Sequence, residues 1–288
     1  MSNLNNRFAP FDDKLAAALE ANVAAALAED IGSGDVTGRL VPGDKEVKAC
    51  VIVREQAVLC GAPWFEAVMK QVDPRLTLDW RYAEGDDLQA KMQLCWITGP
   101  ARSLLTAERT ALNFLQMMSG VATATRKFVQ LVVGTKAEIL DTRKTLPGLR
   151  LAQKYAVRVG GGANQRMALY DGILIKENHI AAAGGITAAL QTAQALNAGV
   201  PVQIEVESLA QLQEALDGGA KLVMLDNFRL EDIRAAVKLN AGRAVLEVSG
   251  GVNFYSVRSI AETGVDRISV GALTKDLHAT DYSLRIFG

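Results

Sequence analysis

The chain has few of the residues that build metal centres and disulfide frameworks. Two histidines occur among its 288 residues, and this scarcity argues against a metal centre built from histidine. The three cysteines, Cys50, Cys60 and Cys95, are odd in number and lack CxxC spacing. This pattern favours reduced, structural thiols in a cytoplasmic protein over disulfides or a zinc site.

Long apolar runs and a strong net charge are also missing. No apolar stretch approaches the roughly 20 residues needed to cross a bilayer, and the first residues lack the basic-then-apolar order of a signal peptide. The formal net charge of −1 gives the whole protein no attraction to nucleic acid or to a membrane surface. We therefore expect a soluble, cytoplasmic protein with neither of those partners, in which an anion site is local.

The length of 288 residues is comfortable for two domains with a sizeable core, and the 49% of apolar residues is typical of a globular protein. Apolar spacing in the first 100 residues predicts helices at 15–27 and 63–72 and short strands at 47–53, 76–82 and 92–98. This order of elements is typical of a small α+β sandwich.

Two segments outside that region have clear patterns of their own. Residues 103–133 have helical spacing, with a break between two helices predicted at Ser119-Gly120. Residues 281–287 alternate as a half-buried strand does, and we expect this strand to pair with the N-terminal sheet.

After residue 134, short apolar strands alternate with amphipathic helices. Strands are predicted at 137–140, 173–175, 202–206, 222–225, 245–248 and 267–270. Helices are predicted at 149–159, 186–196, 209–216, 230–239 and 254–263. Repeated βα units imply parallel strands with right-handed crossovers, in an open doubly wound sheet or in a barrel. The succession has no long break, which favours a barrel, and six strands favour a shortened or incomplete one.

Polar, charged or glycine residues lie at the carboxyl ends of all these strands, where parallel α/β folds gather their reacting groups. They are Asp141, Arg143, Lys144, Lys176, Glu205, Glu207, Asp226, Asn227, Ser249, Gly250, Gly251 and Gly271. Glu205 and Asp226 are hard oxygen donors of the kind that hold Mg²⁺ beside a phosphate, although helix caps or loop salt bridges explain such acids equally well. Backbone N–H groups of the two glycine loops are suited to cradle a phosphate.

The segment 141–180 carries seven Lys/Arg and three acidic residues around the triple glycine 160–162. Such a local excess predicts a pocket for a strongly anionic ligand, and the alternative is a solvated basic helix face. The strand ends favour Arg143, Lys144, Arg166 and Lys176 as the working cations, whereas the helix accounts for Arg150, Lys154 and Arg158 as solvated charge. Mg²⁺, a monophosphate cradle and these cations fit a phosphorylated sugar diphosphate with an acidic second substrate.

Several long motifs in the chain resemble those of the quinolinate phosphoribosyltransferase family. They are EDIGSGDVT (29–37), AERTALNFLQMMSGVAT (107–123), TRKTLPGLR (142–150), KYAV (154–157), GGGAN (160–164), LIKENHI (174–180), LDNF (225–228), EVSGGV (247–252) and VGALT (270–274). The motifs are ordered along nearly the whole chain. The resemblance implies phosphoribosyl transfer from phosphoribosyl pyrophosphate to quinolinate with decarboxylation, in NAD biosynthesis and with Mg²⁺.

The family fold implies an N-terminal open-faced α/β sandwich of residues 1–118 plus 276–288 and an irregular, seven-stranded α/β barrel of residues 119–275. It also implies a homodimer in which Arg109 reaches the site of the other subunit. By motif position, Arg143 and Arg166 would bind the carboxylates of quinolinate, with Thr142 beside them. Lys144 and Lys176 would contact quinolinate or pyrophosphate, Glu205 and Asp226 the metal and ribose, and Ser249, Gly250, Gly251 and Gly271 the 5′-phosphate.

One residue departs from the family pattern. Members usually have GGGxNHR, whereas this chain has Gln165 in place of the histidine. A Gln amide donates hydrogen bonds but cannot become cationic, so carboxylate binding is expected to be weaker by about 1–3 kcal/mol than with a charged histidine. A tolerated natural variant, an engineered change and a paralogue with another substrate all account for it.

Three other functions stay open at this point. The chain is also compatible with a phosphoribosyltransferase for another pyridine acid, such as nicotinate. A paralogue that binds phosphoribosyl pyrophosphate without turnover is a second alternative, opposed by the presence of Lys144, Lys176, Glu205 and Asp226. A Schiff-base aldolase that uses Lys176 is a third, opposed by the acids suited to Mg²⁺.

Overall fold

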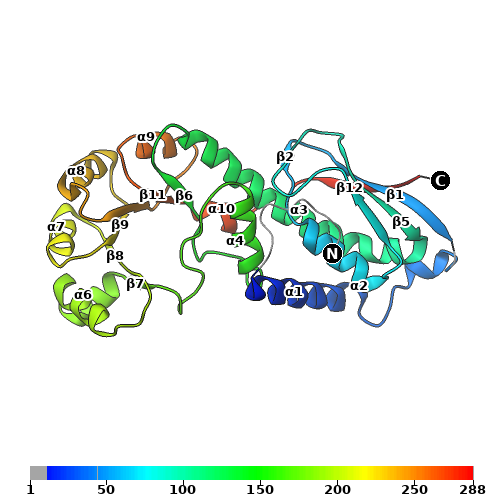
Figure 1. Ribbon diagram of the computed structural model, residues 1–288, viewed down its shortest axis with the longest axis horizontal. Coiled ribbons are helices and arrows are strands. Elements are labelled where there is room, and N and C mark those ends of the chain that lie inside the picture. The colour runs from blue at the N-terminus through cyan, green and yellow to red at the C-terminus, as the bar shows by residue number, and fades with distance from the viewer. Residues whose placement is uncertain (1–11, 44, 288) are drawn as a thin grey trace. The chain divides into compact units, whose positions relative to one another are not determined.

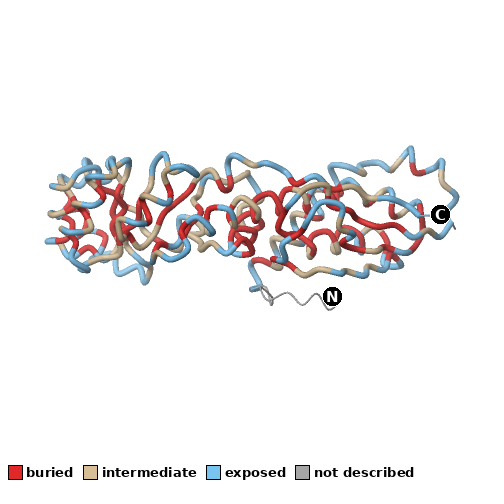
Figure 2. Tube along the Cα trace, turned by 90° about the horizontal axis from the view of Figure 1, so that it is seen from above, coloured by how far each residue is buried: buried red, intermediate tan, exposed pale blue. Residues whose placement is uncertain are grey.

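The computed structural model describes residues 12–43 and 45–287, which divide between two compact units. The first unit consists of residues 1–126, 146–161 and 276–288, and the second of residues 127–145 and 162–275. Within each unit the buried residues run along the strands and the inner sides of the helices (Figure 2).

The bounds of the units differ from the expected division in two segments, 119–126 and 146–161, which lie in the first unit. Arg126 is one reason, because its guanidinium donates to the carboxylate of Asp87 at 2.8 Å and to the backbone oxygens of Gly85 and Gly160. The phenol of Tyr155 is another, since it donates to the buried Glu84 at 2.8 Å. Both contacts join residues that are far apart in the sequence.

The first unit is built on a four-stranded antiparallel sheet in the order β12-β1-β5-β3 (Figure 1). Its strands are β1 (Glu46–Val53), β3 (Thr77–Trp80), β5 (Gln93–Pro100) and β12 (Tyr282–Phe287), with a separate pair β2 (Ala57–Val58) and β4 (Asp87–Leu88). The helices are α1 (Asp13–Ile31), η1 (Thr37–Leu40), α2 (Ala62–Val72), α4 (Arg150–Val159) and the part of α3 (Ala101–Val132) up to residue 126. The antiparallel pairing of β12 with β1 confirms the prediction for the last strand.

Helix α3 is continuous over 32 residues, so the predicted break at Ser119-Gly120 is wrong. Both residues serve close packing. The Ser119 hydroxyl accepts from the backbone N–H of Cys60 and donates to its carbonyl, both at 3.0 Å. A Cβ on Gly120 would lie 2.1 Å from the carbonyl oxygen of His278. Glycine is needed here for close approach of the backbone, a demand that sequence alone does not distinguish from a helix end.

Helix α4 corrects a second expectation, because Lys154 is not a solvated charge. Lys154 is fully buried, as is the next residue, Tyr155, whereas Arg158 is exposed. The three cysteines are free and buried, in keeping with structural thiols.

The second unit is a six-stranded parallel sheet in the order β6-β11-β10-β9-β8-β7. The strands are β6 (Glu138–Leu140), β7 (Ile173–Ile175), β8 (Val202–Val206), β9 (Leu222–Asp226), β10 (Val245–Ser249) and β11 (Arg267–Ser269). Each lies within one residue of its predicted bounds. The family barrel implies a seventh strand, whereas this sheet has six among the described residues, and an isolated parallel bridge joins Leu140 of β6 to Ala163.

Helices follow the strands and lie on the outer side of the sheet (Figure 1). They are α6 (Ile186–Ala195), α7 (Leu209–Asp217), α8 (Leu230–Asn240) and α9 (Val257–Ala261). Two further short helices, α5 (Glu177–Ala183) and α10 (Ala272–Lys275), were not predicted. Helix α9 is shorter than the predicted 254–263, since Asn253 accepts from the backbone N–H groups of Tyr255 and Ser256 and holds 253–256 as a turn. Because all the strands are parallel, their carboxyl ends share one edge.

Candidate active site

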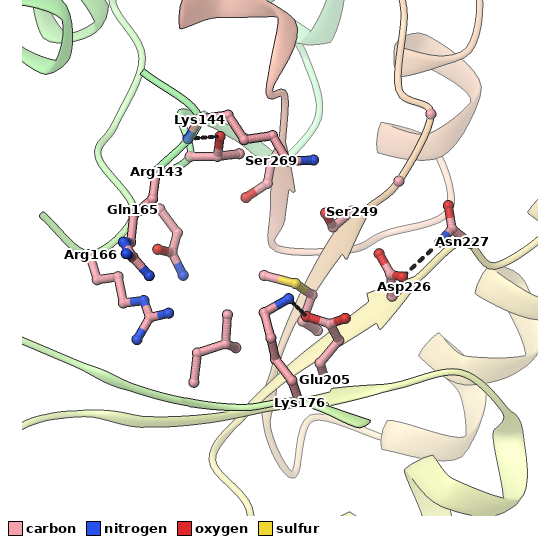
Figure 3. Close-up of a pocket in the computed structure, with 15 residues that line it drawn as sticks. Arg143, Lys144, Gln165, Arg166, Lys176, Glu205, Asp226, Asn227, Ser249 and Ser269 are labelled. Atoms are coloured by element: carbon pink, nitrogen blue, oxygen red, sulfur yellow. Dashed lines mark hydrogen bonds and ion pairs between the residues drawn. The ribbon is translucent and has the colours of Figure 1, made fainter. Parts of the chain in front are cut away.

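A pocket of about 440 Å³ lies at the carboxyl ends of the parallel strands and is lined entirely by residues of the second unit (Figure 3). All but two of the predicted site residues line it. These are Thr142, Arg143, Lys144, Gln165, Arg166, Lys176, Glu205, Asp226, Ser249, Gly250 and Gly251. The pocket has two sides: Arg143, Gln165 and Arg166 lie on one, and Asp226, Asn227 and Ser249 on the other (Figure 3).

Gly271 and Arg109 are the two residues that do not line this pocket. A Cβ on Gly271 would lie 3.3 Å from Cδ of Lys144, so Gly271 adjoins a lining residue. Arg109 is an exposed residue of α3 in the first unit.

Four lining residues were missed as candidates or given no role: Leu174, Met224, Asn227 and Ser269. Three of them lie two positions before a candidate, since Leu174 precedes Lys176, Met224 precedes Asp226 and Ser269 precedes Gly271. Side chains two apart on a strand share a face, so counting back by two from each strand end would have found them.

The two arginines of the pocket have donors that the protein leaves unused. The Nε atoms of Arg143 and Arg166 are buried and have no hydrogen-bond partner. One terminal nitrogen of Arg166 donates to the carbonyl of Gly172 at 2.9 Å. Burial lowers the pKa of Arg166, and the charge of Arg143 adds to this effect. Two adjacent guanidinium groups with buried, unsatisfied N–H donors are suited to a ligand that carries carboxylates.

Asp141 fixes the backbone that carries this side of the pocket. Its carboxylate is fully buried and accepts from the backbone N–H of Gln165 at 3.0 Å and from the side chain of Asn164 at 2.6 Å. Further along the loop, Asp171 accepts from the backbone N–H groups of Met167 and Ala168. These contacts assign structural roles to both acids.

Lys176 and Glu205 form an ion pair at neighbouring strand ends, with Nζ 2.9 Å from Oε2. The second carboxylate of the pocket is that of Asp226. It accepts a hydrogen bond from the side-chain amide of Asn227 at 2.7 Å. Burial raises the pKa of Asp226, and Lys176 acts in the opposite direction. A carboxylate that is partly desolvated in this way favours a cation beside it.

The loop after β10 has the backbone shape of an anion cradle. Gly250 has φ +95° and Gly251 has φ +61°, which are left-handed conformations that favour glycine. A Cβ on Gly250 would lie 2.2 Å from Oδ1 of Asn227, so no other residue fits without movement. The backbone N–H of Asn227 donates to the carbonyl of Ser249 at 3.0 Å and ties this loop to the end of β9.

The carboxylates of the pocket are too few to enclose a metal ion by themselves. Among residues 12–43 and 45–287, no group of three or more His, Cys, Asp or Glu side chains is arranged to hold one. Two carboxylates, such as those of Glu205 and Asp226, are enough for one common kind of Mg²⁺ site. In such sites water and phosphate oxygens of the substrate supply the remaining ligands.

The second unit is thus a parallel α/β fold with a cationic pocket at its strand ends. Two family models match the chain: "Quinolinate phosphoribosyl transferase, N-terminal domain" over residues 35–119 and the C-terminal domain of the same family over residues 121–285. The chain therefore belongs to the quinolinate phosphoribosyltransferase family.

Relatives and solved structures agree with this assignment. The nicotinate-nucleotide pyrophosphorylase [carboxylating] of Mycobacterium leprae is 43% identical over 267 residues, which cover 90% of this chain and 94% of that protein. A probable enzyme of the same name from Bacillus subtilis is 39% identical and covers 90% of both chains. The structure of the nicotinate-nucleotide pyrophosphorylase from Francisella tularensis has a TM-score of 0.90 and 46% identity, and covers 94% of this chain and 96% of that one.

A membrane-spanning segment was not expected, and none of the helices in the described part of the chain is long and apolar enough to form one.

Proposed function

We propose that this protein transfers the phosphoribosyl group of phosphoribosyl pyrophosphate to quinolinate, with loss of carbon dioxide, and forms nicotinate mononucleotide and pyrophosphate. The observation that carries the proposal is the pair of buried, partnerless Nε donors of Arg143 and Arg166 in the strand-end pocket. Two guanidinium groups suit a ligand with two carboxylates. A monoacid such as nicotinate would offer only one carboxylate to the two guanidinium groups.

The reaction needs no protein nucleophile. The pyridine nitrogen of quinolinate attacks C1 of the ribose while pyrophosphate departs, and the charge on the leaving group is balanced by Lys144 and Lys176. Bond formation makes the nitrogen cationic, so the adjacent C–CO₂⁻ bond breaks and carbon dioxide leaves while the electron pair of that bond stays on C2 of the ring. This carbon then takes up a proton from water to give nicotinate mononucleotide. Arg143 and Arg166 hold the carboxylates so that the nitrogen faces the ribose.

Mg²⁺ is part of the proposal. Glu205 and Asp226 would hold it together with oxygens of the pyrophosphate, and it would supply positive charge that eases the departure of that group. The protein's own contribution at the other end is the loop of Ser249, Gly250 and Gly251, whose backbone N–H groups would bind the 5′-phosphate, with Gly271 beside it.

A steady-state assay with quinolinate and nicotinate side by side, with carbon dioxide release measured, tests the reaction. Turnover of quinolinate with equimolar carbon dioxide supports the proposal. Turnover of nicotinate alone would assign the other pyridine acid. Binding of phosphoribosyl pyrophosphate in a calorimeter without turnover of either acid would assign a non-catalytic role.

The proposal extends to a cytoplasmic homodimer in which Arg109 completes the partner's pocket. Arg109→Ala and Lys144→Ala variants, each inactive as a homodimer, should regain activity when they are mixed and allowed to exchange subunits. In a mixed dimer one site receives both wild-type residues. Failure to regain activity, with exchange verified by mass spectrometry, would place Arg109 in its own subunit's site or outside any site.

A further inference from the structure

Beneath the pocket, a chain of hydrogen-bonded side chains crosses the interior of the second unit. Gln165 donates from Nε2 to Oε1 of Gln203 on β8 at 2.9 Å. Gln203 donates from its own Nε2 to Oε2 of Glu247 on β10, also at 2.9 Å. The hydroxyl of Ser269 on β11 donates to the other oxygen of Glu247. Only the two ends of this chain, Gln165 and Ser269, line the pocket.

The strand register places the middle of the chain directly under residues of the site. Gln203 lies two positions before Glu205 on β8, and Glu247 lies two positions before Ser249 on β10. Side chains two apart on a strand share a face, so Gln203 and Glu247 form the layer below Glu205 and Ser249. Gln203 is 7% exposed and Glu247 is 1% exposed, so neither residue is placed to touch a ligand in the pocket.

All three hydrogen bonds of the chain run toward Glu247. Glu247 accepts from the NH₂ group of Gln203, so the carbonyl of Gln203 faces Gln165. Gln165 must therefore present its NH₂ group to Gln203. Because an amide group is planar, fixing one of its hydrogens also fixes its second hydrogen and its oxygen.

A buried polar chain of this kind is costly unless each member is satisfied, and an apolar layer of the same shape would stabilise the fold at least as well. The neighbours of Gln203 and Glu247 along their strands, Ile204 and Leu246, are buried and apolar. The polar residues therefore occur on the face that supports the pocket, where they hold the one amide that lies with Arg143 and Arg166 (Figure 3).

We propose that Gln203 and Glu247 are positioning residues that fix the amide of Gln165 for recognition of the pyridine diacid. Gln165 touches the substrate, and Gln203 and Glu247 act through it. This inference rests on the proposed function for its substrate, while the positioning itself is a property of the protein alone.

The kinetic test replaces Gln203 by methionine, which has a similar length and no hydrogen bonds to give. Gln203→Met should raise the KM for quinolinate about tenfold, with kcat and the KM for phosphoribosyl pyrophosphate changed less than about twofold. In a Gln165→Ala background the same substitution should have no further effect on that KM, because the amide to be positioned is gone. Ile204→Val, on the same strand, is the control for general loss of stability and should leave both KM values unchanged.

The positioning is also measured without turnover, through the side-chain ¹⁵N–¹H₂ resonances of Gln165, assigned by their loss in Gln165→Ala. Gln203→Met and Glu247→Leu should both shift or broaden these resonances, whereas Ile204→Val should not. Unchanged resonances, or an unchanged quinolinate KM in Gln203→Met, would overturn the inference. Shifted resonances in a protein that does not convert quinolinate would instead overturn the proposed function and leave the positioning intact.

Discussion

The ammonium of Lys176 lies 2.9 Å from the carboxylate of Glu205. Lys176 follows β7, and Glu205 is the penultimate residue of its parallel neighbour β8. The Glu205 side chain is 10% exposed and that of Lys176 is 45% exposed, so the pair spans from the floor of the pocket into its open space. In the proposed reaction, an ion pair in this position would hold the lysine where the charge of departing pyrophosphate develops.

We expect Lys176→Gln and Glu205→Gln each to lower kcat about 100-fold, the size seen when one charge-stabilising donor of a transition state is removed. The double variant should lose much less than the product of the single effects, because the pair acts as a unit. Lys136→Gln is the matched control. It breaks a second Lys–carboxylate pair of the same unit, with Asp266 at 2.7 Å, at the amino ends of the strands. Fully additive losses would show that the two residues act separately.

Arg166→Lys keeps the positive charge but removes the guanidinium donors. The KM for quinolinate should rise by at least tenfold, which corresponds to about 1.5–3 kcal/mol for a charged hydrogen bond, and the KM for phosphoribosyl pyrophosphate should stay unchanged. Arg158→Lys, at an exposed position of α4, is the control. Equal effects on both KM values would contradict a separate diacid subsite.

Gln165→His tests the departure from the family pattern. The carbonyl of Gln203 accepts from residue 165, so a histidine there has an acceptor ready for its N–H. A charged imidazole should bind a carboxylate more tightly, and the KM for quinolinate should fall by a factor that corresponds to about 1–3 kcal/mol. The gain should be larger at pH 6 than at pH 8, because the ordinary histidine pKa is about 6.5. A KM for quinolinate equal to that of the unsubstituted protein at both pH values would count against tighter carboxylate binding by histidine.

Gly250→Ala should damage the phosphate cradle. The substitution strains a backbone with φ +95° and puts a methyl group onto Asn227, so we expect the KM for phosphoribosyl pyrophosphate to rise about tenfold with little change for quinolinate. Gly219→Ala is the matched control, because Gly219 has φ +80° but open space around it and follows α7 away from the pocket. A similar effect of both substitutions would point to backbone strain alone.

Glu84 should make the first unit less stable as pH rises. It is buried, and burial raises its pKa from 4.5 to about 7, against hydrogen bonds from the backbone N–H of Ala62 and the phenol of Tyr155. The folded protein therefore keeps a proton that the unfolded chain loses. The protonated Glu84 adds to the free energy of unfolding in full below about pH 4.5, and this stabilisation is lost by about pH 7. The free energy of unfolding therefore falls on the order of 3 kcal/mol over this range.

Urea unfolding at pH 5 and pH 7.5 measures this, with tryptophan fluorescence as the probe. All three tryptophans, Trp64, Trp80 and Trp96, belong to the first unit. Glu84→Gln should flatten the pH dependence, whereas Glu20→Gln, on the exposed side of α1, should preserve it. If the free energy of unfolding of Glu84→Gln still falls as much between pH 5 and pH 7.5, other titrating groups are responsible for the pH dependence.

Local periodicity was sufficient to predict most elements of this fold. The six parallel strands, the helices between most of them and the pairing of the last strand with the N-terminal sheet follow from apolar spacing, because each element buries one face. The positions of the site residues follow as well. Parallel strands bring their carboxyl ends together, so polar residues such as Lys176, Glu205 and Asp226 had to share one edge.

Other features depend on contacts between distant parts of the chain, which no local pattern encodes. Ser119-Gly120 has the composition of a helix break, yet the approach of residue 278 turns it into a packing site within one helix. Lys154 has the sequence context of a solvated charge and is buried. The partnerless guanidinium nitrogens of Arg143 and Arg166 and the link from Gln165 to Glu247 are visible only when the strands are assembled. Sequence determined which groups reach the pocket, and tertiary structure decided how each is held there, because hydrogen-bond geometry is set across strands rather than along them.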